Sequence, residues 1–126
     1  PLLGAAGRTG GMSDTDPVER FREAVDAMDA DGLAAVLAPE FRHDRPDRTI
    51  EGRDRFVEFM MDERPRTDTV HAVDTLFLPE AAADARGREV AAHGRLFADD
   101  GEELFAFVDL FTVADGEIVD LRTFTR

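Results

Sequence analysis

The sequence predicts a single α+β domain, in which two or three helices are followed by a curved antiparallel sheet that encloses a polar-lined pocket. Apolar residues recur at helical spacing over the first half of the chain, and after residue 68 the spacing changes to the alternation of strands. The length of 126 residues suits one domain and leaves little room for a second. We expect that domain to span residues 13–126. Residues 1–12, rich in Gly and Ala, are expected to form a tail outside it.

The first helix is expected to begin at Ser13 or Asp14, because either side chain can cap a helix and Pro17 then falls in the first turn. Four apolar residues recur at helical spacing and predict one buried face. These residues are Val18, Phe21, Val25 and Met28. Asp31-Gly32 is expected to end this helix.

Two further helices are expected before the sheet. Residues 33–37 predict a short helix that stops before Pro39, since the residue preceding a proline disfavours helical geometry. The third helix follows Gly52 and ends at Pro65. Its inward face is expected to carry Phe56, Phe59 and Met60.

The strands are predicted by runs with a period of two, separated by turn residues. They are expected at residues 41–44, 68–78, 88–97, 103–113 and 117–125. Asp99-Asp100-Gly101 and Asp115-Gly116 are typical of hairpin turns, and residues 81–87 are expected to form a loop.

The strand at residues 103–113 is apolar on both faces. One face carries Phe105, Phe107, Asp109 and Phe111, and the other carries Leu104, Ala106, Val108 and Leu110. A sheet with one solvated face would instead alternate apolar with polar residues. One face can cover the pocket and helices, but a chain of this size has no second sheet for the other. We therefore expect a homodimer that packs sheet on sheet through the face bearing Leu104.

The composition excludes several classes of function. The chain has 28 acidic and 15 basic residues, a net charge of −13, and such a surface repels nucleic acid and anionic lipid. Every basic residue is Arg, and an acid excess without Lys resembles proteins of salt-loving microbes. The absence of Cys excludes disulfides, thiolate nucleophiles and Cys-ligated metals. No stretch is apolar enough for a membrane span or a signal peptide, so we expect a cytoplasmic protein.

Asp109 is the first candidate for chemistry, because it lies among Phe residues on the pocket face. A buried carboxylate is costly unless it is paired, hydrogen-bonded or protonated. It is therefore either a pocket acid with a raised pKa, able to donate or accept a proton, or a structural Asp satisfied by an Arg or a backbone N–H.

His93 and Arg95 are two residues apart on the strand expected to pair with that of Asp109, so a contact among the three is plausible. His93 suits proton transfer near neutral pH, and Arg95 suits an ion pair with Asp109 or a substrate oxyanion. A purely structural network is the alternative.

His43 and Arg45 share a face of the strand at 41–44, where His43 is either a base or a half-exposed histidine near a loop. His71 is a weaker candidate. The spacing of these residues does not match a metal-ligand motif, and no phosphate-binding loop or nucleophile–base motif is present. We expect neither a metal nor another cofactor.

The chain resembles the SnoaL-like group of the nuclear-transport-factor-2-like superfamily. Three segments carry the resemblance, which covers residues 16–125: VERFREAVDAMDADGLAAVLAPEFRHD, IEGRDRFVEFM and FVDLFTVADGEIVDLRTF. It implies a cone-shaped α+β barrel with a mixed, mostly antiparallel sheet, dimerisation, and a pocket between helices and sheet. Members include polyketide cyclases, ketosteroid isomerases, epoxide hydrolases, dehydratases and binding domains without catalysis.

The ending of the chain is similar to that of ketosteroid isomerases, and the resemblance places Asp109 on their protonated oxyanion-hole Asp. Phe21 stands at the position of their Tyr, and Arg45 at that of their base. The last-strand Asp of the epoxide hydrolases falls near Thr123. The resemblance thus implies the fold more strongly than any one of these reactions.

Three functions remain open. The first is an acid/base isomerase, cyclase or hydrolase that acts on a small hydrophobic carbonyl compound, with His93 or His43 moving the proton beside Asp109. The second is a binding domain of the same fold, and the third is a dimer whose pocket is filled by its own side chains. The expected binding residues are Arg95, Arg45, Phe21, Phe56, Phe59 and Phe107.

Overall fold

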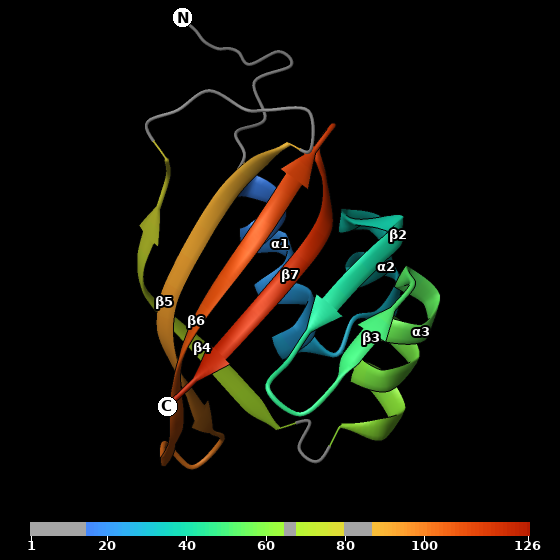
Figure 1. Ribbon diagram of the computed structural model, residues 1–126. Coiled ribbons are helices and arrows are strands. Elements are labelled where there is room, and N and C mark those ends of the chain that lie inside the picture. Colours follow the sequence, from blue (N-terminus) through green and yellow to red (C-terminus); the bar gives the residue numbers. More distant parts are fainter. Residues whose placement is uncertain (1–14, 65–67, 80–86) are drawn as a thin grey trace, which may run out of the picture.

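The computed structural model describes residues 15–64, 68–79 and 87–126. The elements in these ranges are α1 (Thr15–Ala27), α2 (Ala30–Val36), β2 (Leu37–Asp44), β3 (Thr49–Glu51), α3 (Arg53–Glu58), the π-helical turn η1 (Phe59–Glu63), β4 (Thr69–Phe77), β5 (Arg88–Ala98), β6 (Glu103–Ala114) and β7 (Glu117–Thr125). The helices lie together on one side of the sheet, and the other side is left uncovered by the described chain (Figure 1). Within these ranges no helix is long and apolar enough to cross a membrane.

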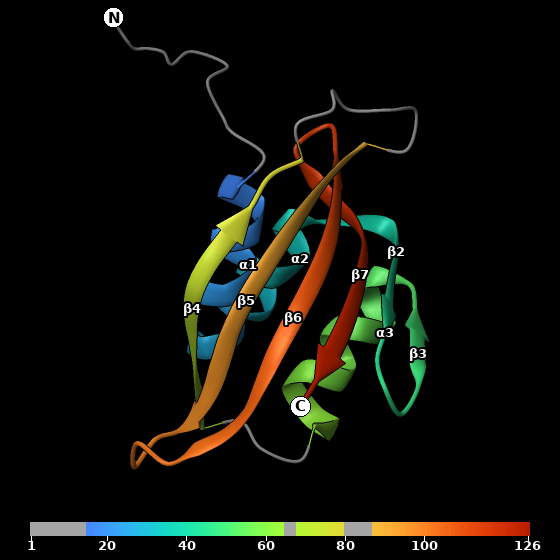
Figure 2. The same ribbon diagram turned by 60° about the vertical axis from the view of Figure 1, so that its left-hand side comes forward.

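The six strands form one sheet in the order β3-β2-β7-β6-β5-β4. All neighbours are antiparallel except β2 and β7, which run parallel. The long strands β5 and β6 bend around the helices (Figure 2). This confirms the predicted α+β fold with a mixed, mostly antiparallel sheet. The sheet does not close into a complete barrel, because β3 and β4 are its two edges.

Helix α1 packs as its apolar spacing predicts. Val18, Phe21 and Val25 are buried on its inner face. The helix ends at Ala27, because the φ of 56° at Met28 is left-handed and cannot continue it. Asp29 then caps α2 by accepting the N–H of Gly32 at 3.0 Å. Asp31-Gly32 therefore lies inside α2, and the prediction that it separates the two helices is wrong.

Strand β2 begins four residues earlier than expected, at Leu37. Leu37 and Ala38 are buried, and Leu37 pairs with Ile118 of β7 before a register shift that extends to Arg42. Burial against the sheet thus extends the strand through Pro39. The short strand β3 pairs with the end of β2 and was not expected. The predicted caps at residues 13 and 14, the helix end at Pro65 and the loop at residues 81–86 lie outside the described residues.

The core lies between the helices and the concave face of the sheet. Phe56 of α3 is fully buried, with its ring 4.9 Å from that of Phe41 and 6.0 Å from that of Phe21. Each such ring contributes roughly 2–3 kcal/mol through burial. Phe21 also meets Phe111 of β6 edge to face at 5.5 Å. This aromatic cluster fixes α1 and α3 against the sheet and forms one wall of the cavity described next.

Candidate functional site

A cavity of about 400 Å³ lies between helix α1, the α3–η1 segment and the concave face of the sheet. Its volume falls within the range of roughly 300–1,000 Å³ that small-molecule pockets occupy. Most of its lining is apolar, as in a pocket for a hydrophobic ligand. The polar lining residues are His43, Arg45, Arg64, Thr69, His71, Asp109, Thr123 and Thr125. The expectation of a polar-lined pocket with apolar walls thus agrees with the structure.

Asp109 projects from β6 into this cavity and is only 9% exposed. Burial raises the pKa of its carboxyl to about 6, against the smaller opposing effects of a hydrogen bond from Thr123 and the charges of His71 and Arg45. Its Oδ1 accepts the Thr123 hydroxyl at 2.6 Å. Its Oδ2 accepts no hydrogen bond from the described residues, and this oxygen is not fully buried. Oδ2 is therefore exposed to the cavity.

His43 projects from β2 and is 5% exposed. Its Nε2 lies 2.8 Å from Thr123 Oγ1, so Thr123 contacts both His43 and Asp109. Burial, followed by the positive charge of Arg45, lowers the pKa of His43 to about 3. The imidazole is therefore neutral near physiological pH, and its Nδ1 is buried without a partner among the described residues.

His71 and Asp26 form a second polar pair at the cavity. His71 Nδ1 lies 2.6 Å from Asp26 Oδ1, and the backbone N–H of His71 donates to Asp26 Oδ2 at 3.1 Å. Because β4 is an edge strand, this N–H has no strand to pair with, and Asp26 of α1 satisfies it. A carboxylate can only accept, so Nδ1 carries the hydrogen of this bond, and in the neutral form of the ring Nε2 has the lone pair. No hydrogen bond involves Nε2 within the described chain.

Two arginines border the cavity. Arg45 lies over the ring of Phe59, 5.0 Å from its centroid, and its Nε is 3.5 Å from Asp47. Arg64 donates to the backbone oxygens of Met60 and Val25 at 3.0 and 3.4 Å. Arg64 thereby ties η1 to α1 beside the cavity.

Several residues expected from the sequence do line the cavity. They are Phe21, His43, Arg45, Phe56, Phe107 and Asp109. Phe59 is buried in the core beneath Arg45 and is not part of the lining.

The expectation that His93 and Arg95 share the pocket with Asp109 is wrong. Asp109 pairs with Ala92 on β5, whereas His93 pairs with Val108 and Arg95 with Ala106. Successive side chains of a strand point to opposite faces, so His93 and Arg95 lie on the outer face of the sheet. Arg95 pairs there with Asp74 at 3.1 Å.

The outer face is the one expected to mediate dimerisation. Ala106 and Leu110 are partly buried on it, and Val108 is 37% exposed opposite Phe124 of β7. Leu104 lies beside the register shift between β5 and β6 and lines the cavity. The alternation that predicts Leu104 on the outer face is therefore interrupted at this end of β6.

The structure adds Asp26 and Thr123 to the site and gives His71 a partner. Asp26 and His71 are 45 residues apart, and no spacing rule connects them. Thr123 alternates with Leu121 and Thr125 along β7, a signal for a shared face but not for a polar contact. These contacts depend on how α1 is placed on β4 and how β7 is placed between β2 and β6.

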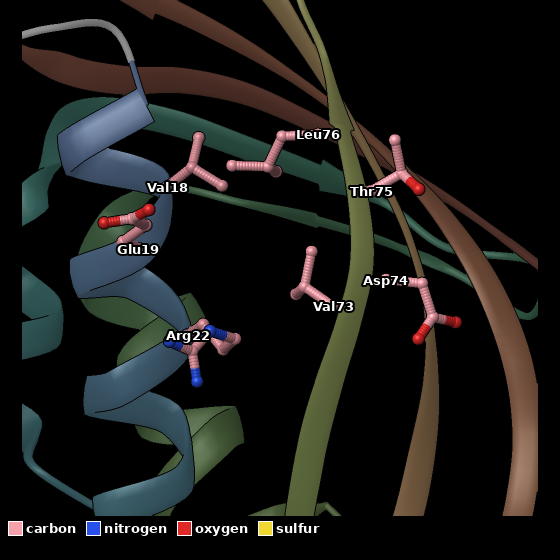
Figure 3. A pocket seen from close by; sticks show the side chains of 7 residues that line it. All are labelled: Val18, Glu19, Arg22, Val73, Asp74, Thr75 and Leu76. Atoms are coloured by element: carbon pink, nitrogen blue, oxygen red, sulfur yellow. The ribbon is translucent and has the colours of Figure 1, made fainter.

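A second cavity, of about 500 Å³, lies between α1 and the edge strand β4. Val18 of α1 faces Val73 and Leu76 of β4 across it, while Asp74 points away from the helix (Figure 3). Asp74 is engaged by Arg95, which lowers the pKa of Asp74 through a hydrogen bond. Glu19 and Arg22 of α1 and Thr75 of β4 also line this groove.

The structure shows no cluster of three or more His, Asp or Glu residues suited to a metal ion in the parts of the chain it describes. The polar groups around the first cavity can instead move protons and donate hydrogen bonds.

Comparison with known proteins identifies the fold. Residues 18–121 match the family model of the SnoaL-like domain. No curated protein sequence matches the chain. An NTF2-like protein of unknown function from Cytophaga hutchinsonii has a similar structure, with 18% identity, a TM-score of 0.73 and 94% of each chain covered.

Two further structures are similar. A candidate ketosteroid isomerase from Kribbella flavida has 22% identity and a TM-score of 0.69, covering 87% of this chain and 75% of its own. A candidate SnoaL-like polyketide cyclase from Jannaschia sp. has 20% identity and a TM-score of 0.67, covering 89% of this chain and 84% of its own. At these identities the likeness establishes the fold.

Proposed function

Because the chain belongs to the SnoaL-like domain family, we propose that it binds a small, mainly apolar carbonyl compound and moves a proton on it, as an isomerase or cyclase does. The observation that carries this proposal is the pair of titratable groups at one apolar cavity. Asp109 is a buried carboxyl with a pKa of about 6, and His71 is an imidazole held by the carboxylate of Asp26. Groups of this kind supply the acid and the base of a proton transfer.

His71 is assigned as the base. Its Nδ1–H donates to Asp26, so the lone pair of Nε2 is available to take a proton from carbon beside the carbonyl. The carboxylate also stabilises the imidazolium that forms. The ring meets Phe107 edge to face at 5.6 Å, which further limits its orientation. A positioned base of this type contributes roughly 10²–10⁴-fold to a rate.

Asp109 is assigned as the hydrogen-bond donor to the carbonyl oxygen, where negative charge develops as the proton leaves carbon. The donor is the protonated carboxyl, with Oδ2 reaching the cavity. An apolar ligand that displaces water desolvates this group further and favours its protonated form. Since the pKa of free Asp109 is about 6, kcat/KM is expected to fall as pH rises through that value.

Two similar structures support this reaction class, because one is a candidate ketosteroid isomerase and the other a candidate polyketide cyclase. His43 is less suited to be the base, since its pKa is about 3 and its Nε2 is already bonded to Thr123.

The proposal is tested by exchange of carbon-bound hydrogen for deuterium. Cyclic and aromatic enones and β-diketones would be incubated with the protein in D₂O, and exchange beside the carbonyl followed by proton NMR. His71→Gln is expected to slow the exchange at least 100-fold, and Asp109→Ala to slow it as well. His93→Gln is the matched control, because His93 is an exposed histidine on the outer face. Equal rates in the wild type and His71→Gln would remove the assignment.

A binding domain without catalysis is the second candidate. The observation that favours it is that Thr123 already joins Asp109 and His43 through two short hydrogen bonds. Under this alternative, some compounds of the panel raise the melting temperature in a saturable way, but none exchanges hydrogen faster than in buffer. The two functions are thus separated in one set of samples.

A further inference from the structure

We infer that Thr123 and His43 are positioning residues that determine which oxygen of Asp109 faces the cavity and carries its proton. The kinetic consequence of this inference rests on the proposed function, but the structural claim rests on contacts alone. Neither residue needs to touch a substrate. Both act through Asp109, the only one of the three to which we assign a catalytic contact.

The three side chains come from three adjacent strands. Asp109 of β6 lies directly opposite Thr123 of β7, and His43 of β2 pairs with Leu121 two residues before Thr123. The two contacts are short, at 2.6 Å from Thr123 Oγ1 to Asp109 Oδ1 and 2.8 Å from His43 Nε2 to Thr123 Oγ1. Groups held on paired strands are placed more accurately than groups on loops.

The direction of the chain of hydrogen bonds follows from counting hydrogens. A threonine hydroxyl has one hydrogen, and Thr123 donates it to Asp109 Oδ1. With its hydrogen donated to Asp109, Thr123 Oγ1 can only accept from His43. The hydrogen of the neutral imidazole must therefore be on Nε2. Nδ1 is left without a hydrogen and is buried without a partner among the described residues.

This order fixes the two oxygens of Asp109 in different roles. Oδ1 accepts from Thr123, whereas Oδ2 has no hydrogen bond in the described chain and reaches the cavity. When Asp109 takes up a proton, binding at Oδ2 leaves the Thr123 and His43 hydrogens where they are. Binding at Oδ1 would instead require the hydroxyl to rotate and the buried imidazole to move its hydrogen to Nδ1. The acid hydrogen therefore points at the ligand.

Other charged groups surround this chain of hydrogen bonds without bonding to the Asp109 carboxyl. His71 of β4, with Asp26 of α1 behind it, and Arg45 after β2 line or adjoin the same cavity. Arg64, at the end of η1, lines it as well. His71 and Arg45 lower the pKa of Asp109 through their charge, but among the described residues only Thr123 hydrogen-bonds to the carboxyl and so selects between its two oxygens.

The first test needs no substitution at the site. In protein labelled with ¹⁵N-histidine, nitrogen shifts distinguish ring nitrogens with and without hydrogen. We expect His43 to carry hydrogen on Nε2 and none on Nδ1 at both pH 5 and pH 8, on either side of the Asp109 titration. His71→Gln and His93→Gln would identify the other two histidines. A hydrogen on Nδ1 of His43 at either pH would overturn the inference.

The second test removes the hydroxyl. In Thr123→Val the pKa of Asp109, followed by ¹³C NMR of its carboxyl and identified with Asp109→Asn, is expected to rise by about one or more, because a donor to the carboxylate is lost. Thr123→Ser restores the donor and is expected to match the wild type. Thr125→Val is the matched control, since Thr125 also lines the cavity on β7 without a hydrogen bond to Asp109. An unchanged or lower pKa in folded Thr123→Val would contradict the inference.

The two proposals fail in different ways. If no compound undergoes exchange, the proposed reaction fails, but the tautomer of His43 and the titration of Asp109 still test the positioning role. If exchange is found, its pH profile is expected to move upward in Thr123→Val and to return in Thr123→Ser. A loss of packing alone would lower stability without moving this profile.

Discussion

Asp109 links the stability of this protein to pH, and Asp109→Asn measures that link. The pKa of the carboxyl is about 6 in the folded chain, against an ordinary value of 3.8. Between these two pH values the unfolded chain releases its proton while the folded chain keeps it, so the wild type loses stability as pH rises. At 1.36 kcal/mol per unit of pKa, the loss reaches about 3 kcal/mol above pH 6. It is absent below the unfolded value.

Asparagine does not ionise, but it has almost the same shape and still offers an oxygen to the Thr123 hydroxyl. Asp109→Asn is therefore expected to gain about 3 kcal/mol on the wild type between pH 4 and pH 8. The free energy of unfolding would be measured by urea titration of both proteins at each pH and one fixed salt concentration. Titrating groups that do not interact with Asp109 contribute equally to both proteins and cancel in the difference.

Asp74→Asn is a suitable control, because the pKa of Asp74 is shifted in the direction opposite to that of Asp109. The hydrogen bond from Arg95 lowers the pKa of Asp74, so this exposed carboxylate gains nothing from neutralisation. A difference between Asp109→Asn and the wild type that stays constant from pH 4 to pH 8 would refute the reasoning. So would a difference that favours the wild type as pH rises.

Three further predictions follow from individual residues. Because burial lowers the pKa of His43 to about 3, the free energy of unfolding is expected to fall by roughly 5 kcal/mol as pH drops from 6.5 to 3. In urea titrations His43→Gln is expected to weaken this dependence of unfolding free energy on pH. The same pH dependence in the variant and the wild type would contradict the prediction. A Cβ on Gly94 would lie 2.4 Å from the Ala72 carbonyl oxygen, so Gly94→Ala is expected to cost about 1–3 kcal/mol of unfolding free energy, and an unchanged melting temperature would disprove the close approach. We also propose that a second copy of the chain covers the outer face, where Val108 and Phe124 are exposed and where Arg95 pairs with Asp74 and Arg122 with Glu89. Light scattering is expected to give twice the chain mass of 13.9 kDa for the wild type and the single mass for Val108→Glu. A monomeric wild type would reject the dimer.

The sequence determined the fold class because periodicity is a local property. Helical spacing from Val18 to Val25 and alternation along residues 103–113 each report a buried face without knowledge of any other segment. The burial of Asp109 among Phe residues follows from the same alternation, whereas the raised pKa of its carboxyl is only one of the two alternatives that the sequence leaves open. Boundaries were less well determined where a single contact outweighed the local signal, as with Asp29 capping α2 across Gly32.

The pocket that the sequence placed inside the curved sheet is present, but only the tertiary structure decided which polar groups face it. His93 and Arg95 were assigned to it from their spacing, and the register of β5 on β6 turns them outward, because one residue of register reverses a side chain. The contacts of Thr123 with His43 and Asp109, and of His71 with Asp26, join segments 14 to 80 residues apart. No local pattern contains such contacts, since they arise only when strands and helix are packed at one angle and register. The sequence therefore predicts the buried carboxyl of Asp109, and the packing of strands and helix places Thr123, His43 and His71 around the same cavity.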